Sequence, residues 1–308
     1  MTTIFSQVGK KITAKVAGLV PDAAVIAIAD SGPLPVELEA EVLLTQTWGS
    51  DNIADTVERG VRWIHTLGTG VDRFPFDAVG DCVVTCSRGA SSIPIAEYVL
   101  AAMLAFEKQI PQVWMSRAPE NWYGSRLGGL YRKTLGLVGL GGIGLAVAAR
   151  ALAFGMTVVA TRRSDTLSPL AGVEIATLDE VLGRADHLAL AASATEETKG
   201  LIDSGKFAMM KRGVHLVNVA RGSLIDQDAL FVALGDGTVA CATLDTMSPE
   251  PLPAAHWMYD HPKVRLTPHV SWSMPGAVDL LLDRFLENLD RYRHGAPLDN
   301  VVDRTAGY

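Results

Sequence analysis

Three glycines with a fixed spacing follow the short apolar run of residues 135–138. This spacing is typical of a loop that binds the pyrophosphate of a dinucleotide: the first glycine allows a tight turn off a strand, the second lets the backbone approach the phosphates, and the third lets a helix pack closely. The first N–H groups of that helix would point at the phosphates, helped by the helix dipole. The alternative is a glycine-rich turn that binds no ligand. The predicted cofactor contacts in this loop are Gly139, Gly141, Gly142, Ile143 and Gly144.

Two arginines stand at the end of the next expected strand, where the charge selects the cofactor. A fold selective for NAD places an acidic residue about 20 residues past the glycines, where it binds the ribose hydroxyls. Here Arg162 and Arg163 occupy that position, and Asp165, the nearest acid, comes too late. Guanidinium groups suit a 2′-phosphate. We therefore predict NADP(H) as the preferred cofactor, with NAD(H) as the weaker one; the alternative is that both arginines only face solvent.

Two further loops follow the ends of expected parallel strands, which is where such sheets bind ligands. The first contains Gly68, Thr69 and Gly70, whose backbone N–H groups could hold a small carboxylate. An ordinary tight turn is the alternative there. The second contains Arg221, directly after the expected strand 214–220, so that we expect its side chain in the cofactor crevice.

Alternating strands and helices must position these loops, which predicts an α/β fold with parallel sheets covered on both faces. We expect a capping residue at Asp51 and another at Asp226, a long apolar helix over 94–109, a connecting arm over 121–133 and a last helix over 275–293. The expected strands of the first part are residues 25–29, 42–45, 61–66 and 83–86. Those of the second part are residues 135–138, 156–161, 187–191, 214–220, 239–244 and a last segment starting at 264.

The composition excludes several classes of protein. The 308 residues carry a formal net charge of −7, which argues against a nucleic-acid or anionic-membrane partner. Residues 135–160 are apolar, but their glycines and Arg150 interrupt any membrane-spanning helix. The three cysteines, Cys82, Cys86 and Cys241, form no metal-ligand pattern, and Cys82 and Cys86, on the same expected strand, are expected as buried thiols. No signal peptide is evident, so we expect a cytoplasmic protein.

Several motifs in a fixed order resemble the NAD(P)-dependent D-isomer-specific 2-hydroxyacid dehydrogenases, and the resemblance covers nearly the whole chain. They are Gly68-Thr-Gly-Val-Asp72, Ala96-Glu97, Gly139-Leu-Gly-Gly-Ile-Gly144, Val217-Asn-Val-Ala-Arg-Gly222, Leu244-Asp245 with Glu250-Pro251, and Thr267-Pro-His269. The resemblance implies two Rossmann-like domains with an active-site cleft between them and a homodimer joined through the cofactor domains. The implied substrate domain is 1–98 completed by 275–308, and the implied NAD(P)-binding domain is 99–274.

The catalytic triad of that family falls on Arg221, Glu250 and His269, and each residue type suits its role. Arg221 would pair with the carboxylate of a 2-keto acid and polarise the neighbouring carbonyl. His269 would donate a proton to the developing alkoxide, and Glu250 would orient the imidazole. The resemblance also places Ala220 and Asp245 against the cofactor. Taken singly, each of these residues has a structural alternative, such as a turn cap, a solvated loop residue or a core histidine.

Trp272 departs from the family pattern, because relatives often have a small residue three positions past the histidine. An indole there would narrow the substrate pocket, so Trp272 joins Gly68, Thr69 and Gly70 as an expected substrate contact. Trp48 is expected in the core, with the cleft as the alternative. The predicted function is reduction of glyoxylate, hydroxypyruvate or a similar keto acid. Two alternatives stay open: a phosphoglycerate dehydrogenase-type enzyme, and a dinucleotide-sensing interaction protein of the corepressor type, which Trp272 and the apolar helix 94–109 favour.

Overall fold

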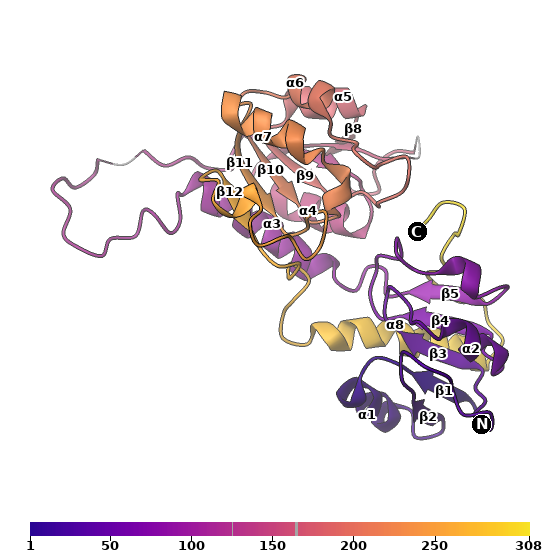
Figure 1. The fold of residues 1–308 in the computed structure, drawn as a ribbon. Coiled ribbons are helices and arrows are strands. Elements are labelled where there is room, and N and C mark those ends of the chain that lie inside the picture. Colours follow the sequence, from indigo (N-terminus) through magenta and orange to yellow (C-terminus); the bar gives the residue numbers. More distant parts are fainter. Residues whose placement is uncertain (125, 164–165) are drawn as a thin grey trace. The chain divides into compact units, whose positions relative to one another are not determined.

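The computed structural model describes residues 1–124, 126–163 and 166–308. The chain forms two compact units, each an α/β fold built on a parallel sheet (Figure 1). The first unit contains Met1–Ser91 and Met274–Tyr308, and the second contains Ser92–Ser273. The predicted fold class, two α/β domains with parallel sheets, is confirmed. The chain thus enters the second unit at Ser92, earlier than the predicted residue 99, because the whole helix that begins there packs in the second unit.

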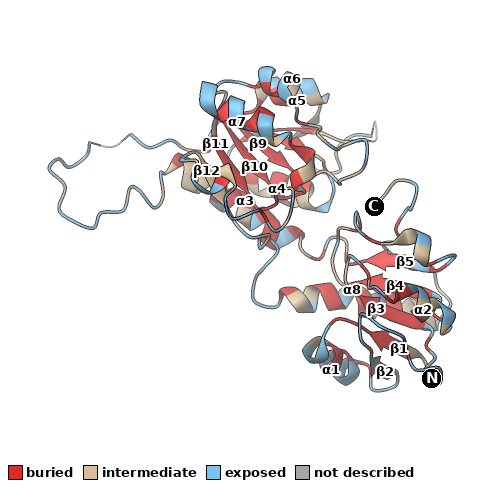
Figure 2. Ribbon diagram, in the orientation of Figure 1, coloured by how far each residue is buried: buried red, intermediate tan, exposed pale blue. Residues whose placement is uncertain are grey.

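The first unit has a five-stranded sheet in the order β2-β1-β3-β4-β5. Its strands are β1 (Thr3–Ser6), β2 (Ala24–Ala27), β3 (Val42–Thr45), β4 (Trp63–Thr66) and β5 (Val83–Cys86). Its helices are α1 (Lys10–Leu19), α2 (Ile53–Glu58), the single 3-10 turn η1 (Phe76–Ala78) and α8 (Ala277–Arg293). Strands β1, β3, β4 and β5 are mostly buried, and one face of α8 contributes Leu282, Phe285 and Leu289 to the core (Figure 2).

Two expectations for the first unit were wrong. The strand predicted at 25–29 as buried is the edge strand β2, and its residues are half-buried or exposed because a neighbouring strand covers only one side. Asp51 does not cap α2: the helix follows Asn52, whose side chain makes no capping bond because its Oδ1 instead accepts from the Gln7 amide at 2.9 Å. Strand β1 and helix α1 had not been predicted.

The second unit has a seven-stranded parallel sheet in the order β12-β11-β10-β9-β6-β7-β8. Its strands are β6 (Thr134–Val138), β7 (Thr157–Thr161), β8 (Val173–Ile175), β9 (His187–Leu190), β10 (Val214–Asn218), β11 (Val239–Leu244) and β12 (Val264–Leu266). Its helices are α3 (Ser92–Glu107), α4 (Gly142–Ala153), α5 (Leu178–Arg184), α6 (Ser204–Ala208) and α7 (Gln227–Asp236), with 3-10 turns η2 (Gly222–Leu224) and η3 (Trp257–Tyr259). As predicted, Asp226 caps a helix, accepting from the N–H groups of Asp228 and Ala229.

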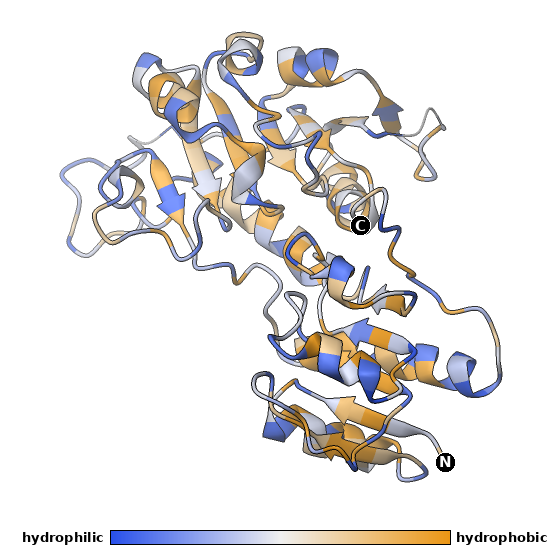
Figure 3. Ribbon diagram, turned by 45° about the vertical axis from the view of Figure 1, so that its right-hand side comes forward, coloured by the Kyte–Doolittle hydropathy of each residue, from blue (hydrophilic) through white to orange (hydrophobic). Residues whose placement is uncertain are grey.

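Successive residues of the central strands face two different cores, because side chains alternate across a strand. Val159 and Leu216 lie in the core beneath α5, α6 and α7, whereas their neighbours Val158 and Val217 lie in the core beneath α3 and α4. In Figure 3 much of these strands is orange, the apolar end of the scale. Burial on both faces explains why these strands are continuous apolar runs.

The segment that raised the question of a membrane span, residues 135–160, folds as strand β6, a loop, helix α4 and strand β7. Within the part of the chain that the structure describes, no helix combines the length and the apolar character needed to cross a bilayer.

Candidate active site

Arg221 lies just beyond the carboxyl end of β10, and Asn218, the last residue of that strand, holds its turn. The amide of Asn218 donates through Nδ2 to the carbonyl oxygen of Arg221 at 2.8 Å and accepts at Oδ1 from the N–H of Ala220 at 3.0 Å. The guanidinium of Arg221 donates through Nη1 to the Ala220 carbonyl at 2.8 Å. The partly exposed arginine is therefore held at both its backbone and its side chain.

Glu250 and His269 form a hydrogen-bonded pair beyond the ends of β11 and β12. The His269 Nδ1 lies 3.0 Å from the Glu250 Oε2, and the other carboxylate oxygen accepts from the N–H of Met247 at 3.0 Å. Burial alone would raise the pKa of Glu250, but the bonds from His269 and Met247 and the nearby charge of Arg221 outweigh it and hold that pKa below its usual value. Glu250 is thus held as a carboxylate against the ring, which leaves Nε2 of His269 as the nitrogen that can exchange a proton with a ligand.

The loop that carries Arg221 and the loop that carries Glu250 pack directly on each other. At Gly222 a Cβ atom would stand 2.0 Å from the carbonyl carbon of Met247, so only glycine permits this backbone contact. The side chain of Gln227 adds a second tie by donating to the carbonyl of Ser248. Arg221 and Glu250 therefore belong to one packed unit, although 29 positions separate them in the sequence.

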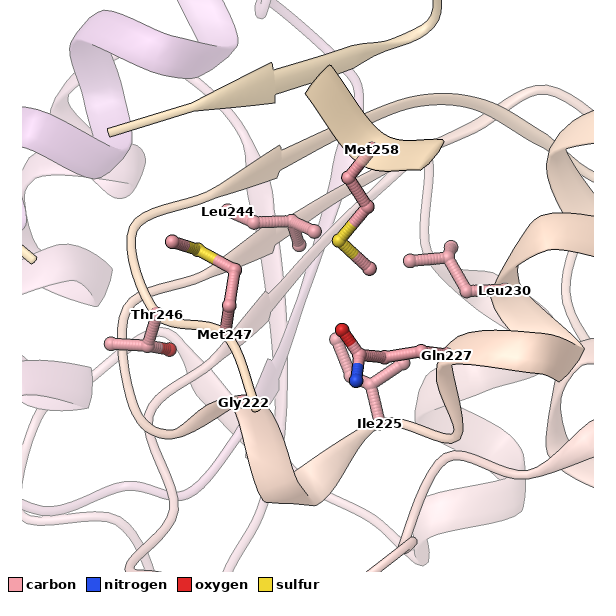
Figure 4. Close-up of a pocket in the computed structure, with 8 residues that line it drawn as sticks. All are labelled: Gly222, Ile225, Gln227, Leu230, Leu244, Thr246, Met247 and Met258. Carbon is pink, nitrogen blue, oxygen red and sulfur yellow. The ribbon is translucent and has the colours of Figure 1, made fainter. Parts of the chain in front are cut away.

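A small pocket lies under these two loops (Figure 4). It is formed by aliphatic and thioether side chains together with two polar ones, Gln227 and Thr246. Arg221, Glu250 and His269 do not line it, so we assign it to the packing behind the loops. Its lining residues are Gly222, Ile225, Gln227, Leu230, Leu244, Thr246, Met247 and Met258.

Asp245 follows β11 and is fully buried. Its Oδ1 accepts from the Thr267 hydroxyl at 2.6 Å and the Val270 N–H at 2.8 Å, and its Oδ2 accepts from the Ser271 N–H at 2.9 Å. The Asp245 carbonyl accepts from the N–H of His269 at 2.9 Å. The role as a cofactor contact stays a prediction, and the geometry gives this residue a second role, which is to hold the loop that bears His269.

The glycine loop begins where β6 ends and leads into α4, which starts at Gly142. Gly139 has φ +99°, and a Cβ atom there would stand 2.7 Å from the Ala192 nitrogen; a Cβ at Gly144 would stand 2.2 Å from the Gly139 oxygen. At Gly141 no atom lies within 4 Å of that position. The loop is thus packed tightly on its inner side and open at Gly141, which fits the approach of a dinucleotide pyrophosphate to the helix N-terminus. Ile143 is the next residue of that first helical turn.

Arg162 follows the last residue of β7, and β7 pairs directly with β6. The N–H of Gly139 donates to the carbonyl of Thr161 at 3.0 Å, which ties the glycine loop to the residue before Arg162. The Arg162 Nη1 donates to the Leu167 carbonyl at 3.2 Å, and Arg163 is exposed. Ser164 and Asp165 lie outside the described residues, so the structure does not bear on the prediction for that acid.

The remaining predicted residues are distributed over both units. In the first unit Gly68, with φ +155°, accepts at its carbonyl from the Ser87 N–H at 2.8 Å, and the Thr69 hydroxyl donates to the Ser87 carbonyl at 3.3 Å. Gly70 completes this loop, and its role toward substrate stays a prediction. In the second unit the indole N–H of Trp272 donates to the carbonyl of His269 at 3.0 Å. Trp48 is 62% exposed, so the expectation that it packs in the core was wrong.

Comparison with known proteins decides the family. A sequence model described as "D-isomer specific 2-hydroxyacid dehydrogenase, NAD binding domain" matches residues 100–271, which is more than half of the chain. The chain belongs to the D-isomer specific 2-hydroxyacid dehydrogenase family. The family has an NAD-binding domain, and solved relatives contain NADP or NADPH, so this family uses a nicotinamide dinucleotide.

Individual relatives from the family carry different names. The chain is 37% identical to the D-3-phosphoglycerate dehydrogenase of Bacillus subtilis over 250 residues, or 78% of this chain and 46% of that protein. A D-isomer specific 2-hydroxyacid dehydrogenase of Xanthobacter autotrophicus, solved with NADPH and MES, is 27% identical with a TM-score of 0.87, covering 100% of this chain and 99% of that one. The NADPH-dependent glyoxylate/hydroxypyruvate reductase of Sinorhizobium meliloti, solved with NADP and sulfate, is 25% identical with a TM-score of 0.86 and full coverage of both chains. The chain spans about half the length of the curated relatives it matches.

The sequence had pointed to Arg221, Glu250 and His269 but not to the residues that hold them. Asn218 stands inside a quoted motif without a role, and the close approach of Gly222 to Met247 was not foreseen. The motif spacing could have suggested Asn218, since an amide at a strand end often bonds its own backbone two or three residues on. Nothing in the local sequence reveals the Met247 contact, because that contact depends on which loops are neighbours in space.

Proposed function

We propose that this protein is an NAD(P)-dependent oxidoreductase that reduces a short 2-keto acid, such as glyoxylate or hydroxypyruvate, to the D-2-hydroxy acid. The observation that carries the proposal is the Glu250–His269 pair, held at 3.0 Å beside Arg221 at the carboxyl ends of β10, β11 and β12. The glycine loop opens from β6 at the same edge of the same sheet. Ligands of open parallel sheets bind at this edge.

Each residue of the group has a role that its chemistry suits. The Arg221 guanidinium pairs with the substrate carboxylate and polarises the carbonyl. The glycine loop 139–144 would hold a nicotinamide cofactor, which would be the source of the hydride for the carbonyl carbon. His269 gives the proton from Nε2 to the carbonyl oxygen, and Glu250 fixes the ring and compensates the imidazolium charge. In the reverse direction the neutral imidazole accepts that proton.

The activity is tested by mixing the pure protein with NADPH or NADH and a panel of acids, and following nicotinamide absorbance. The panel contains glyoxylate, hydroxypyruvate, 3-phosphohydroxypyruvate and larger 2-keto acids. Oxidation of NADPH with a short unphosphorylated keto acid supports the proposal. Turnover of only the phosphorylated acid would favour the phosphoglycerate dehydrogenase-type reaction. The curated relatives named above as D-3-phosphoglycerate dehydrogenases support this alternative.

If no acid of the panel is reduced and titration shows NADPH binding, the result would instead favour the third candidate, a dinucleotide-sensing interaction protein. The aromatic Trp272 had suggested this candidate, and so had the apolar helix now seen as α3. The structure accounts for most of α3 without a partner, since about half of its residues are buried and pack in the core of the second unit, whereas Ile93 is exposed.

Preference for NADPH over NADH is the next part of the proposal, and Arg162 supports it by its place beside the glycine loop. We expect Arg162→Ala to weaken NADPH binding by roughly 10- to 100-fold, the worth of one or two charge-assisted hydrogen bonds to a phosphate. Affinity for NADH should change by less than about twofold, since NADH has no phosphate at that position. Fluorescence titration of both cofactors measures this. Arg163→Ala serves as the matched comparison, and equal losses for the two cofactors in Arg162→Ala would show that Arg162 does not read the phosphate.

We also propose that two copies of the chain associate through the segment that follows α3, residues 108–124 and 126–128, which we call the arm. This segment extends away from the body of the second unit (Figure 1) and exposes Trp114, Met115, Trp122 and Tyr123. Its two ends are pinned together, because the N–H of Gly128 donates to the Glu107 carbonyl at 2.9 Å. Large exposed apolar side chains on a held segment are typical of an interface between proteins.

The double variant Trp114→Ser/Trp122→Ser tests the arm. Light scattering should give the mass of a dimer for the unchanged chain and that of a monomer for the variant, because the interface loses two large apolar anchors. Trp48→Ser, which alters an exposed tryptophan of the first unit, is the control and should remain a dimer. A dimer that persists in the double variant would place the interface elsewhere.

A further inference from the structure

A hydrogen-bonded chain of three side chains leads from helix α3 to the loop that bears His269. The Tyr98 hydroxyl lies 2.7 Å from the Thr267 Oγ1, and that hydroxyl lies 2.6 Å from the Asp245 Oδ1. We propose that Tyr98 is a positioning residue for proton transfer, acting on His269 through Thr267 and Asp245. The proposal rests on the proposed function and adds to it a residue that does not touch the substrate.

The direction of the hydrogen bonds follows from a count of protons. Asp245 accepts at Oδ1 from the Thr267 hydroxyl and the Val270 N–H, and at Oδ2 from the Ser271 N–H. The Thr267 hydroxyl has one proton and gives it to Asp245, so Tyr98 must supply the other bond as the donor. Burial raises the pKa of Tyr98 and, with the charge of Asp245, outweighs the Thr267 bond, which keeps the phenol protonated.

Asp245, the last of the three hydrogen-bonded residues, fixes the backbone on both sides of His269. Asp245 binds the N–H groups of the two residues after His269 through its carboxylate, and the N–H of His269 itself through its carbonyl. His269 has φ +55°, a left-handed conformation that non-glycine residues seldom adopt and that surrounding bonds must maintain. The direction of its side chain therefore depends on the bonds that Asp245 makes, and the Trp272 indole holds the His269 carbonyl from the other side.

The hydrogen bonds from Tyr98 to Asp245 also join two segments that are far apart in the sequence. Tyr98 lies on the first helix after the chain enters the second unit at Ser92, whereas Thr267 lies shortly before the chain leaves that unit after Ser273. Their contact spans 169 positions. Tyr98 can thus fix the loop of His269 from outside it, which no residue within the loop can do.

Three variants test the proposal, each with kcat, KM and the Kd for NADPH measured separately. Tyr98→Phe removes only the hydroxyl, and we expect kcat to fall roughly tenfold with the Kd for NADPH unchanged. Thr267→Val should lower kcat by roughly 10- to 100-fold, whereas Thr267→Ser, which keeps the hydroxyl, should stay within about twofold of the unchanged protein. The kcat of the double variant Tyr98→Phe/Thr267→Val should be no lower than that of Thr267→Val alone, because both changes interrupt the same series of hydrogen bonds.

Tyr292→Phe, which removes the hydroxyl of a partly buried tyrosine in the first unit, is the matched control and should keep its kcat. The proposal is overturned by an unchanged kcat in Tyr98→Phe, by Thr267→Ser losing as much as Thr267→Val, or by losses that multiply in the double variant. If Tyr98→Phe fails to fold, the comparison of the two Thr267 variants still decides.

A spectroscopic measurement separates failure of this proposal from failure of the proposed function. The ring signal of His269 in an NMR spectrum, assigned by its absence in His269→Gln, should shift in Tyr98→Phe and stay in place in Tyr292→Phe. This readout requires no turnover. A shifted signal in a protein that reduces no acid would retain the positioning role and reject the reductase, whereas an unmoved signal in an active protein would reject the positioning role alone.

Discussion

Replacing His269 with glutamine is expected to lower kcat by roughly 10²- to 10⁴-fold, the usual worth of a positioned general acid. The imidazole is bound at Nδ1 by Glu250 and is 40% exposed, so its other nitrogen can reach a ligand. Glutamine keeps a polar side chain in the loop but cannot deliver a proton. The Kd for NADPH should change by less than about threefold, since the glycine loop lies at another strand of the sheet. Steady-state kinetics with a keto acid, together with a cofactor titration, measure both quantities.

The control for this change is His294→Gln, which alters an exposed histidine near the end of α8 in the first unit. It should keep the full kcat. A His269→Gln protein that retains a rate close to that of the unchanged protein would remove His269 from the proton-donor role. A protein that loses NADPH affinity and kcat together would point to a collapsed site instead, so the two measurements must be read jointly.

Acidification is expected to destabilise the first unit by roughly 3 kcal/mol between pH 6.5 and pH 4, and His65 is the cause. Burial lowers the pKa of His65 from 6.5 to about 3. Its Nδ1 lies 2.8 Å from the Thr85 Oγ1 and its Nε2 lies 3.1 Å from the Ser87 Oγ, so both nitrogens already have neutral partners. Above pH 6.5 the ring is neutral in both the folded and the unfolded chain, and the full stability is present. Below that pH only the unfolded chain takes up the proton until about pH 3, so stability is lost over this interval.

The measurement compares the unchanged protein with His65→Asn across the pH range 7.5 to 4. Hydrogen exchange of peptides from β4 reports the first unit separately from the second, where His187 has a pKa lowered to about 4, mainly by burial, and would add its own pH dependence. The free energy of unfolding of His65→Asn should fall by roughly 1.4 kcal/mol less per pH unit between pH 6 and pH 4. His294→Asn is the control. Identical slopes in all three proteins would show that His65 is not the acid-sensitive group.

The sequence by itself was sufficient for features that depend on neighbouring residues. The apolar runs and their spacing indicated parallel strands, and nearly every strand of the second unit was predicted within a few positions, because strands buried on both faces are continuous apolar runs. The glycine spacing indicated a tight turn into a helix, and α4 begins within that motif. The order of several motifs indicated the family, which the comparison with known proteins confirmed.

Features that depend on the arrangement of the whole sheet were predicted less well from the sequence. Strand β1 was missed, and the neighbouring β2 was expected to be buried although it lies at the sheet edge. Whether a strand is central or at the edge depends on the order of strands in the sheet, which local periodicity does not encode. Trp48 was expected in the core, yet most of its surface is exposed.

Only the tertiary structure decided how the site is held. The strand order places β10, β11 and β12 side by side, and that adjacency brings the loops of Arg221, Glu250 and His269 to one edge. The supporting bonds join residues that are remote in the sequence, such as Tyr98 with Thr267. A hydrogen bond or a close backbone contact acts over a few ångströms, so its partners are set by the packing of whole elements and not by the residues next to them in the chain. Residue types therefore indicated the chemistry that we propose for the chain, whereas the packing of its loops determined which side chains hold Arg221, Glu250 and His269 in place.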